Sequence, residues 1–337
     1  MLAGAVPGFQ PRLQQQVMAE AVADALEQVP SSLLIEAATG VGKTFAYLVP
    51  ALLSGRRVVI STGTKTLQDQ LFEKDLPVVC RALGVNPRLA LLKGRSNYLC
   101  LYRLELNAQE AAGRGRQAAT LEALRRYGRL SDTGDLTQAE ILAEDAPLWP
   151  QVTSTVDNCL GNECPSFNEC FVVRARRRAQ DADVIVVNHH LLLADLALKD
   201  EGFGELLPQV DAVIVDEAHQ LPEIAGAFFG LAFGTRPLRD LGRDITRELD
   251  RNAPDLVDLR EPVSGLQDAV GALLHCTMGW SARAGWNEVV DTAGLGAALD
   301  GVDRALETLE SGLEAAAGRS AGLEQAHTRC GTLRQRL

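Results

Sequence analysis

The sequence predicts an α/β fold in which a parallel sheet is flanked by helices, and three observations support this prediction. Short apolar runs alternate with helix-length amphipathic segments from the start of the chain to about residue 90, which is typical of strand–helix–strand units. Two further apolar runs, "DADVIVVN" at 181–188 and "VDAVIVDEAH" at 210–219, continue this pattern. After residue 220 the strand pattern ends, so a helical region is expected to follow.

The elements follow in order along the chain. We expect strands at "SLLIEA" (32–37) and "RRVVIST" (56–62), and two more at the runs near 181 and 210. The polar helical segments and clustered cysteines between residues 100 and 180 indicate an insertion into this α/β domain. Beyond it, apolar residues on helical faces predict long helices packed as an antiparallel hairpin or coiled coil, whose core has no function of its own. These are Leu238, Leu241, Ile245 and Leu249, then Leu295, Leu299, Val302, Leu306, Leu309 and Leu313.

Composition restricts the class of protein. The 337 residues are 46% hydrophobic and carry a formal net charge of −11, so any nucleic-acid site has to be a local basic patch. The first residues show no secretory signal and no run is long enough for a membrane span, which predicts a cytoplasmic protein. Seven cysteines suit metal ligation better than a disulfide framework, and Cys80, Cys276 and Cys330 are expected to be inert.

A phosphate-binding loop is expected after the first strand, in "SLLIEAATGVGKT". Glycines let backbone N–H groups turn toward an anion, the following helix directs its N-terminus at it, and a lysine reaches the terminal phosphates. Ala37 stands where such loops usually begin with glycine, but the strand, helix and Lys-Thr pair argue against a chance match. The hydroxyl of the threonine is expected on Mg²⁺. The nucleotide-binding candidates are Thr39, Gly40, Val41, Gly42, Lys43 and Thr44.

The strand at 210–219 ends in an acidic turn. Asp216 is expected to hold Mg²⁺ through water, and Glu217 to polarise the attacking water as the catalytic carboxylate. His219 lies close enough to sense the state of the nucleotide. A lone acidic pair would more often be a solvated turn, but the phosphate loop upstream favours a nucleotide hydrolase site formed by Lys43 with these three residues.

The cysteines of "CLGNECPSFNEC" have the spacing C-x4-C-x5-C. Structural zinc sites usually have closer pairs and often histidine, whereas iron–sulfur clusters take four thiolates with freer spacing. Cys100, in "LLKGRSNYLC", opens the inserted region that this triplet closes, so it is the expected fourth ligand. The predicted set is Cys100, Cys159, Cys164 and Cys170, with zinc in place of iron as the alternative.

These motifs together resemble a known family. "EAATGVGKT" and "VDEAH" are similar to motifs I and II of superfamily 2 DEAH-box helicases, and the cysteine pattern before "VVNHHLLLADL" narrows the resemblance to the iron–sulfur helicases of the XPD/DinG family, in particular to bacterial DinG-like proteins of the YoaA type. The resemblance implies a RecA-like motor domain (1–92 and 181–228), an inserted [4Fe-4S] domain (93–180) and an incomplete helical arch domain (229–337).

Other site residues follow from the resemblance alone. It implies that Arg12 and Gln15 recognise adenine, where a solvated helix start would be the alternative. It also implies that Thr62 and Thr64 contact the DNA backbone; without the family they would be an ordinary helix cap. A basic helical face after the last clustered cysteine would line a single-strand channel, and it consists of Arg174, Arg177 and Arg178.

The function that the resemblance implies is an ATP-dependent 5′–3′ DNA helicase that acts on single-stranded DNA and DNA junctions in repair or replication, with ATP, Mg²⁺ and a [4Fe-4S] cluster as cofactors. The residues after the acidic turn contain neither S-A-T nor Q-x-x-G-R, so a second motor domain is expected to be absent. The chain alone is then expected to bind nucleotide but to unwind nothing. A module that binds ATP and DNA without unwinding is the alternative.

Overall fold

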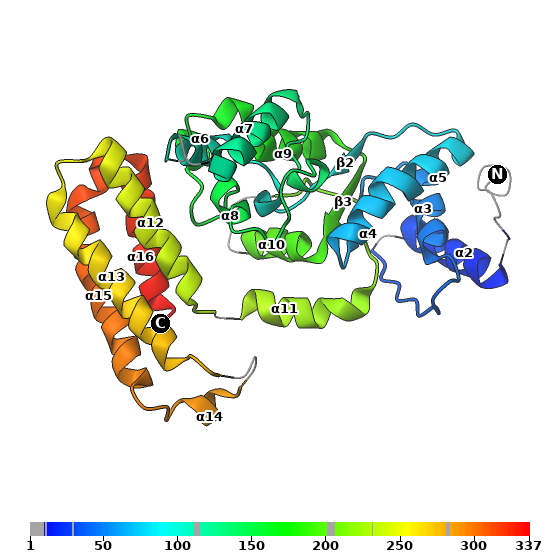
Figure 1. Ribbon diagram of the computed structural model, residues 1–337. Helices are drawn as coiled ribbons and strands as arrows, with labels where there is room; N and C mark the ends of the chain where they lie inside the picture. Colours follow the sequence, from blue (N-terminus) through cyan, green and yellow to red (C-terminus); the bar gives the residue numbers. More distant parts are fainter. Residues whose placement is uncertain are drawn as a thin grey trace. The chain divides into compact units, whose positions relative to one another are not determined.

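The computed structural model describes residues 10, 12–28, 30–110, 115–200, 206–230, 232–280 and 284–337. They form two compact units, shown in Figure 1. The first unit comprises Met1–Ser154 and Asn168–Gly230, and the second comprises Thr155–Phe167 and Leu231–Leu337, in each case over their described residues. No helix in the described parts of the chain has the length and apolar character needed to cross a membrane.

The first unit contains a four-stranded sheet in the order β2-β3-β1-β4, and all its strand pairs are parallel. The strands are β1 (Val58–Thr62), β2 (Leu89–Leu91), β3 (Val184–Asn188) and β4 (Ala212–Val215). Val58 lies opposite Val184 on one side and Ala212 on the other. Three of the four predicted strands are therefore confirmed, and their carboxyl ends meet at one edge of the sheet, where α/β proteins place their ligands.

The predicted strand at 32–37 is not formed. Among the described residues this segment has no strand partner, and the side chains of Leu33 and Leu34 are 46% and 90% exposed. An apolar run before a glycine-rich loop has the pattern of a strand, but cross-strand pairs and burial stabilise a strand, and this segment has neither. As a result β4 is an edge strand of the described sheet, and Val213 is 49% exposed.

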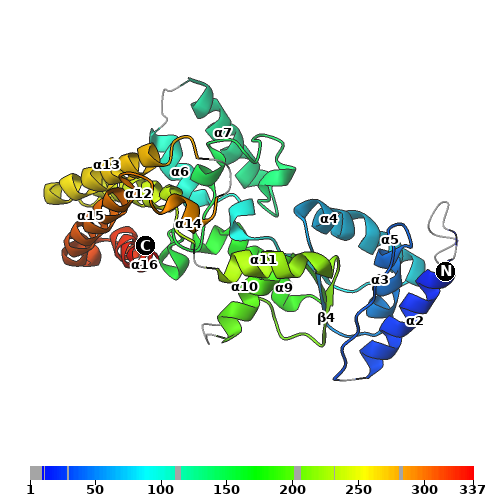
Figure 2. The same cartoon turned by 90° about the horizontal axis from the view of Figure 1, so that it is seen from below.

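Ten α-helices are described in the first unit. They are α2 (Leu13–Glu27), α3 (Lys43–Leu53), α4 (Lys65–Gln70), α5 (Leu76–Leu83), α6 (Leu101–Glu110), α7 (Gly115–Leu130), α8 (Trp149–Val152), α9 (Phe171–Asp181), α10 (His189–Asp200) and α11 (Leu221–Phe229). Figure 2 shows α2, α3 and α5 beside one another, next to the strands.

Alternate strand residues face opposite sides of the sheet. Ile60 and Val186 belong to the apolar cluster formed with α2, α3 and α5. Val59 and Ile185 belong to a different cluster, which contains buried residues from α6, α7, α9 and α10. The buried apolar side chains between residues 98 and 152 and between 171 and 182 thus pack onto one face of the sheet.

A buried ion triad joins this part of the chain to the helix that follows β1. The ammonium nitrogen of Lys93 lies 2.6 Å from Oδ1 of Asp69, in α4, and 2.6 Å from Oδ2 of Asp135. The Lys93 side chain is 1% exposed and that of Asp135 is 4% exposed. Burial acts to lower the pKa of Lys93, but the two carboxylates outweigh it and the pKa is raised. The lysine is therefore charged inside the protein because it has two acidic partners.

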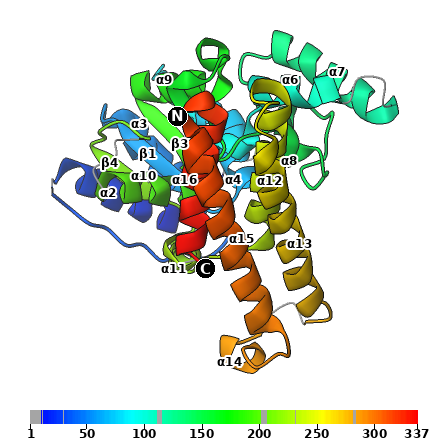
Figure 3. The same cartoon turned by 90° about the vertical axis from the view of Figure 1, so that its left-hand side faces the viewer.

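The second unit is a bundle of four long helices with the short α14 (Trp286–Val289). The long helices are α12 (Thr235–Asn252), α13 (Arg260–Cys276), α15 (Leu295–Ala316) and α16 (Ala321–Gln335). In Figure 3 they run up and down in turn, each packed against its neighbours in the chain, and α12 also packs against α16. This confirms the prediction of long antiparallel helices.

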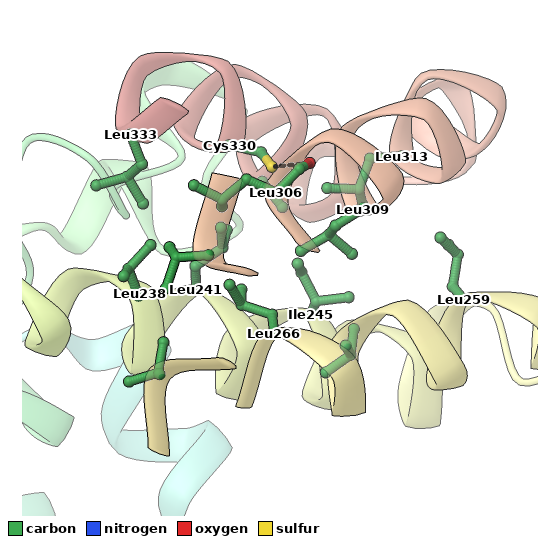
Figure 4. Packing of buried hydrophobic residues seen from close by; sticks show 14 of the residues in the cluster. Leu238, Leu241, Ile245, Leu259, Leu266, Leu306, Leu309, Leu313, Cys330 and Leu333 are labelled. Carbon is green, nitrogen blue, oxygen red and sulfur yellow. Dashed lines mark hydrogen bonds between the residues drawn. The ribbon is translucent and has the colours of Figure 1, made fainter. Parts of the chain in front are cut away.

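The predicted apolar faces form the core of this bundle, as Figure 4 shows. Leu238, Leu241 and Ile245 are fully buried. The thiol of Cys330 is buried among them and donates a hydrogen bond to the carbonyl oxygen of Leu306 at 3.4 Å. Burial raises the pKa of Cys330 to about 12, which is the behaviour of an inert structural thiol.

Candidate nucleotide-binding site

Two glycines give the loop before α3 its shape. Gly40 and Gly42 have positive φ angles of 78° and 91°, a conformation that glycine adopts without steric cost. Gly42 is the N-cap residue of α3, and Lys43 and Thr44 form its first turn. The unpaired N–H groups of a helix N-terminus and the positive end of its dipole favour an anion in this position. The loop therefore has the shape and charge of a phosphate site.

The side chain of Gln15 lies directly behind this loop. Its amide donates a hydrogen bond to the carbonyl oxygen of Gly42 at 2.9 Å, and a Cβ on Gly42 would lie 2.2 Å from the amide nitrogen. Arg12 is exposed, and its guanidinium lies beside Gly40. The structure thus brings both residues to the phosphate loop, while their assignment to adenine stays a prediction.

Asp216 follows β4 and its carboxylate is held from two directions. Tyr47, one turn after Thr44 in α3, donates its phenolic hydrogen to Oδ2 at 3.0 Å. The backbone N–H of Glu217 donates to Oδ1, also at 3.0 Å. Burial first, and then the charge of Asp216, raise the pKa of Tyr47, so the phenol remains protonated and can donate. This fixes the orientation of the carboxylate expected to hold the metal ion.

Glu217 adopts an unusual backbone conformation between two basic side chains. Its φ of 54° makes it one of the two non-glycine residues with positive φ in the described chain, and such outliers gather at functional sites. Its carboxylate lies 3.5 Å from the ammonium of Lys43 and 3.4 Å from Nδ1 of His219. Lys43 also donates to the carbonyl oxygen of Ala37 at 3.4 Å. The lysine and the predicted catalytic carboxylate are therefore neighbours.

The residues present fit a magnesium nucleotide. Lys43 and the glycine loop supply positive charge and N–H groups for phosphates, while Thr44 and Asp216 supply the oxygen ligands that Mg²⁺ prefers. The Thr44 hydroxyl also interacts with the Tyr47 phenol, so the predicted metal ligands and the residue that supports them come from one helix and one strand end. Sequence reasoning missed Tyr47; its only signal is its place three residues after Thr44 in the helix.

The hydroxyls predicted to contact DNA have partners within the protein. Thr64 is the N-cap residue of α4, and its oxygen accepts a hydrogen bond from the N–H of Leu67 at 3.2 Å. Thr62 is 1% exposed and donates to the carbonyl oxygen of Thr64 at 3.3 Å. Thr64 is exposed. The contact of these residues with a DNA backbone stays a prediction.

The basic face of α9 is described in full. Arg177 and Arg178 are exposed, whereas Arg174 is half-buried with its guanidinium carbon 4.4 Å from the centre of the Phe171 ring. A guanidinium over an aromatic ring is held by a cation–π interaction. Two of the three arginines thus present their charge to solvent.

The four predicted cluster ligands are half-buried, and none of the seven cysteines forms a disulfide. Cys100 lies directly before α6 and Cys170 is the N-cap residue of α9, both in the first unit. Cys159 and Cys164 belong to the second unit, on either side of a short 3₁₀ turn. In the part of the chain that the structure describes, no three potential ligands are gathered as a metal site. The four-thiol ligand set stays a prediction.

The fold and the site together define the class of protein. A parallel sheet carries an acidic turn at the carboxyl end of β4, and the phosphate loop lies beside that turn, as in P-loop nucleotide hydrolases of the helicase type. The family model for DEAD/DEAH box helicases matches residues 12–98.

The relatives narrow this class. The chain is 43% identical to the ATP-dependent DNA helicase YoaA of Haemophilus influenzae over 334 residues, which is 98% of this chain and 52% of the relative. For YoaA of Escherichia coli the identity is 44% over 339 residues, 100% of this chain and 53% of the relative. The ATP-dependent helicase DinG of Mycobacterium tuberculosis is 35% identical over 277 residues, 74% of this chain and 40% of the relative. The chain belongs to the DinG/YoaA family of ATP-dependent DNA helicases, and it spans about half the length of these YoaA relatives.

Proposed function

We propose that this chain is the ATP-binding portion of a DNA helicase motor and that its first unit binds ATP with Mg²⁺. The contact that supports this is the ion pair of Lys43 and Glu217 at 3.5 Å, beside the glycine loop. When phosphates bind to Lys43, this ion pair is broken and the carboxylate of Glu217 is released to orient a water for attack. Asp216, held by Tyr47, then faces the metal ion.

Nucleotide binding by the 337-residue chain tests this proposal. We expect Mg²⁺-ATP to bind with the wild-type chain and to bind at least about tenfold more weakly with Lys43→Ala, because a charge-assisted contact to phosphate contributes about 1.5–3 kcal/mol. The exposed Lys74 provides the matched control, since Lys74→Ala removes the same charge from the same unit. Equal affinity of Lys43→Ala and the wild type in calorimetric titration would contradict the proposal. Hydrolysis, measured with and without single-stranded DNA, then shows whether the chain alone turns over.

The proposed nucleic-acid partner is single-stranded DNA, along with DNA junctions. Arg177 and Arg178 are exposed on one face of α9, and a few arginines suffice to neutralise phosphates on a locally basic surface. The relatives named as DNA helicases support DNA as the substrate class. Thr62 and Thr64, in the β1–α4 turn, would contact the backbone of the DNA strand.

The salt dependence of DNA binding separates a phosphate contact from a general effect of charge. Each arginine that neutralises a phosphate of single-stranded DNA contributes about 0.7 to the slope of log affinity against log salt concentration. We expect Arg177→Ala/Arg178→Ala to lower this slope by about 1.4. Arg129→Ala, at another exposed arginine of the first unit, should leave it unchanged. An unchanged slope in the double variant would show that α9 is not part of the DNA-binding surface.

We also propose that Cys100, Cys159, Cys164 and Cys170 hold a [4Fe-4S] cluster. Four half-buried thiols without disulfides are the donor set that such clusters take. Cys100 and Cys170 stand at helix N-termini, where the negative charge of a thiolate is favoured. When bound, the cluster would cross-link the chain at these four cysteines.

Anaerobic reconstitution tests the ligand set. We expect the wild-type chain to take up iron and acid-labile sulfide in equal amounts with a visible charge-transfer band, and Cys100→Ala to lose both. Cys276 is half-buried but outside the set, so Cys276→Ala should reconstitute normally. Purified chain that carries stoichiometric zinc and takes up no iron would contradict the cluster and favour the zinc alternative.

A further inference from the structure

The turn that carries the acidic residues touches the segment between the two threonines assigned to DNA. The side-chain amide of Gln220 lies against the Cα of Gly63, so closely that a Cβ on Gly63 would be 2.1 Å from Oε1 of the glutamine. Gly63 lacks a positive φ, so it is this contact, and not the backbone conformation, that leaves no room for a side chain. Gly63 directly follows Thr62, at the end of β1.

Gln220 is also linked to Glu217, the residue of the catalytic carboxylate, by a backbone hydrogen bond within one turn. Glu217 is the N-cap residue of the 3₁₀ turn Ala218–Gln220, and its carbonyl oxygen accepts a hydrogen bond from the backbone N–H of Gln220 at 3.0 Å. A change in the strained backbone of Glu217 therefore changes the position of Gln220, because one rigid turn contains both residues. The side chain of Glu217 is at the same time the ion partner of Lys43.

The ends of β1 and β4 are held by hydrogen bonds, whereas the contact of Gln220 with Gly63 can change. The backbone N–H of Asp216 donates to the carbonyl oxygen of Ser61 at 2.8 Å. The Ser61 hydroxyl and Nδ1 of His189 are 2.7 Å apart, and both side chains are completely buried. Gln220 is only half-buried. A movement of the acidic turn thus displaces the β1–α4 turn through the Gln220 amide. The ends of β1 and β4 keep their register, because the Asp216–Ser61 hydrogen bond joins them.

We infer that Gln220 transmits the state of the nucleotide site to the DNA-facing turn at Thr62–Thr64. This inference rests on the proposed function, because it requires both ligands to bind. Lys43 and Glu217 form an ion pair. When phosphate binds Lys43, the ion pair with Glu217 breaks and the 3₁₀ turn shifts. The Gln220 amide then moves against Gly63, and this movement changes the conformation in which the β1–α4 turn meets DNA. Gln220 acts here through its contacts with Glu217 and Gly63, so it is a positioning residue.

The test is the thermodynamic coupling between the two ligands, which a purely structural residue would not alter. The affinity of the 337-residue chain for a fluorescent oligothymidine is measured with and without saturating Mg²⁺ and a non-hydrolysable ATP analogue, and the affinity for the analogue is measured with and without the oligonucleotide. Linkage requires the two ratios to be equal. We expect a ratio of about fivefold or more in the wild-type chain, which is the lower end of allosteric coupling.

Two variants remove the contact from opposite sides. Gln220→Ala takes away the amide, and Gly63→Ala pushes it away; the flexible end of the glutamine can yield, so the fold is retained. We expect each variant to reduce the ratio to within about twofold of unity, and Gln220→Ala to keep its affinity for either ligand alone. The double variant should be no worse than either single variant, because both act on one contact. Thermal unfolding of each variant verifies that it is folded.

Matched controls and the wild-type data separate the possible failures. Gly226→Ala, at a helical glycine with open space around it, and Gln117→Ala, at an exposed glutamine of α7, should keep the wild-type ratio. A wild-type chain that binds only one ligand would overturn the proposed function. A chain that binds both without coupling, or variants that couple as the wild type does, would leave the proposed function intact and overturn the role of Gln220.

Discussion

Replacing Lys93 with methionine should destabilise the first unit strongly. Methionine has a similar length and packs well in apolar surroundings, so the substitution removes the charge while nearly preserving the volume. It leaves the carboxylate of Asp135, 4% exposed, without its cation. Breaking a buried ion pair by removing one partner costs about 3–5 kcal/mol. Asp135 retains hydrogen bonds from the N–H and hydroxyl of Thr137 at 3.0 and 2.7 Å, which places the expected loss near the lower end, about 3 kcal/mol.

The assay is urea unfolding followed by tryptophan fluorescence. Trp149 is 6% exposed in the first unit, whereas Trp280 and Trp286, in the second unit, are 37% and 60% exposed. Converting the latter two to phenylalanine leaves a fluorescence signal that reports on the first unit alone. In thermal unfolding the same loss corresponds to a decrease in Tm of roughly 6–12 °C, since 1 kcal/mol shifts a domain of this size by about 2–4 °C.

A second substitution identifies the cause. If the unpaired charge of Asp135 produces the loss, then Lys93→Met/Asp135→Asn should be more stable than Lys93→Met, because an amide has no charge to leave uncompensated. Lys74→Met, at an exposed lysine, should remain within about 0.5 kcal/mol of the wild type. A loss below about 1 kcal/mol for Lys93→Met, or a double variant no more stable than the single one, would refute the reasoning.

Two further predictions concern other contacts of the first unit. Tyr47→Phe removes the hydrogen bond to Asp216, so we expect the affinity for Mg²⁺-ATP to fall about tenfold while the affinity for metal-free ATP stays constant; an equal fall in both would assign Tyr47 to packing. Gly134 combines a φ of +66° with the Phe171 ring, which a Cβ would approach to 2.1 Å, whereas Gly84 has a φ of +68° and open space. Gly84→Ala should therefore cost about 1–2 kcal/mol in backbone strain alone, and Gly134→Ala about 1–3 kcal/mol more from overpacking, as measured by urea unfolding; equal losses would contradict the clash.

Much of this architecture could be predicted because local patterns determine it. The strands around Ile60 and Val186 are continuous apolar runs, and such runs form buried parallel strands. The bundle helices followed from leucines at helical spacing, which the core around Ile245 confirms. The segment around Leu34 has an equally apolar pattern, but a strand also needs a partner, and no local pattern contains one.

The contacts that organise the site could not be predicted from local patterns. Tyr47 and Asp216 are 169 residues apart in the chain, and their hydrogen bond exists only because α3 and the end of β4 meet at one edge of the sheet. The amide of Gln220 against Gly63 depends on the same meeting of distant segments. Sequence reasoning located the loop and the acidic turn as two motifs, and the tertiary fold determines how one acts on the other.

The exposed edge of β4 has a consequence for the behaviour of the chain in solution. β4 pairs only with β1 in the described sheet, and an edge strand with unpaired N–H and C=O groups is a template onto which another strand can add. The exposed apolar run around Leu34 is a second strand-forming segment without a partner. Because Asp216 directly follows β4, a strand added in crowded solution would change the surroundings of the acidic turn. The ligand affinity of this chain is therefore expected to depend on protein concentration, and binding should be measured over a series of dilutions.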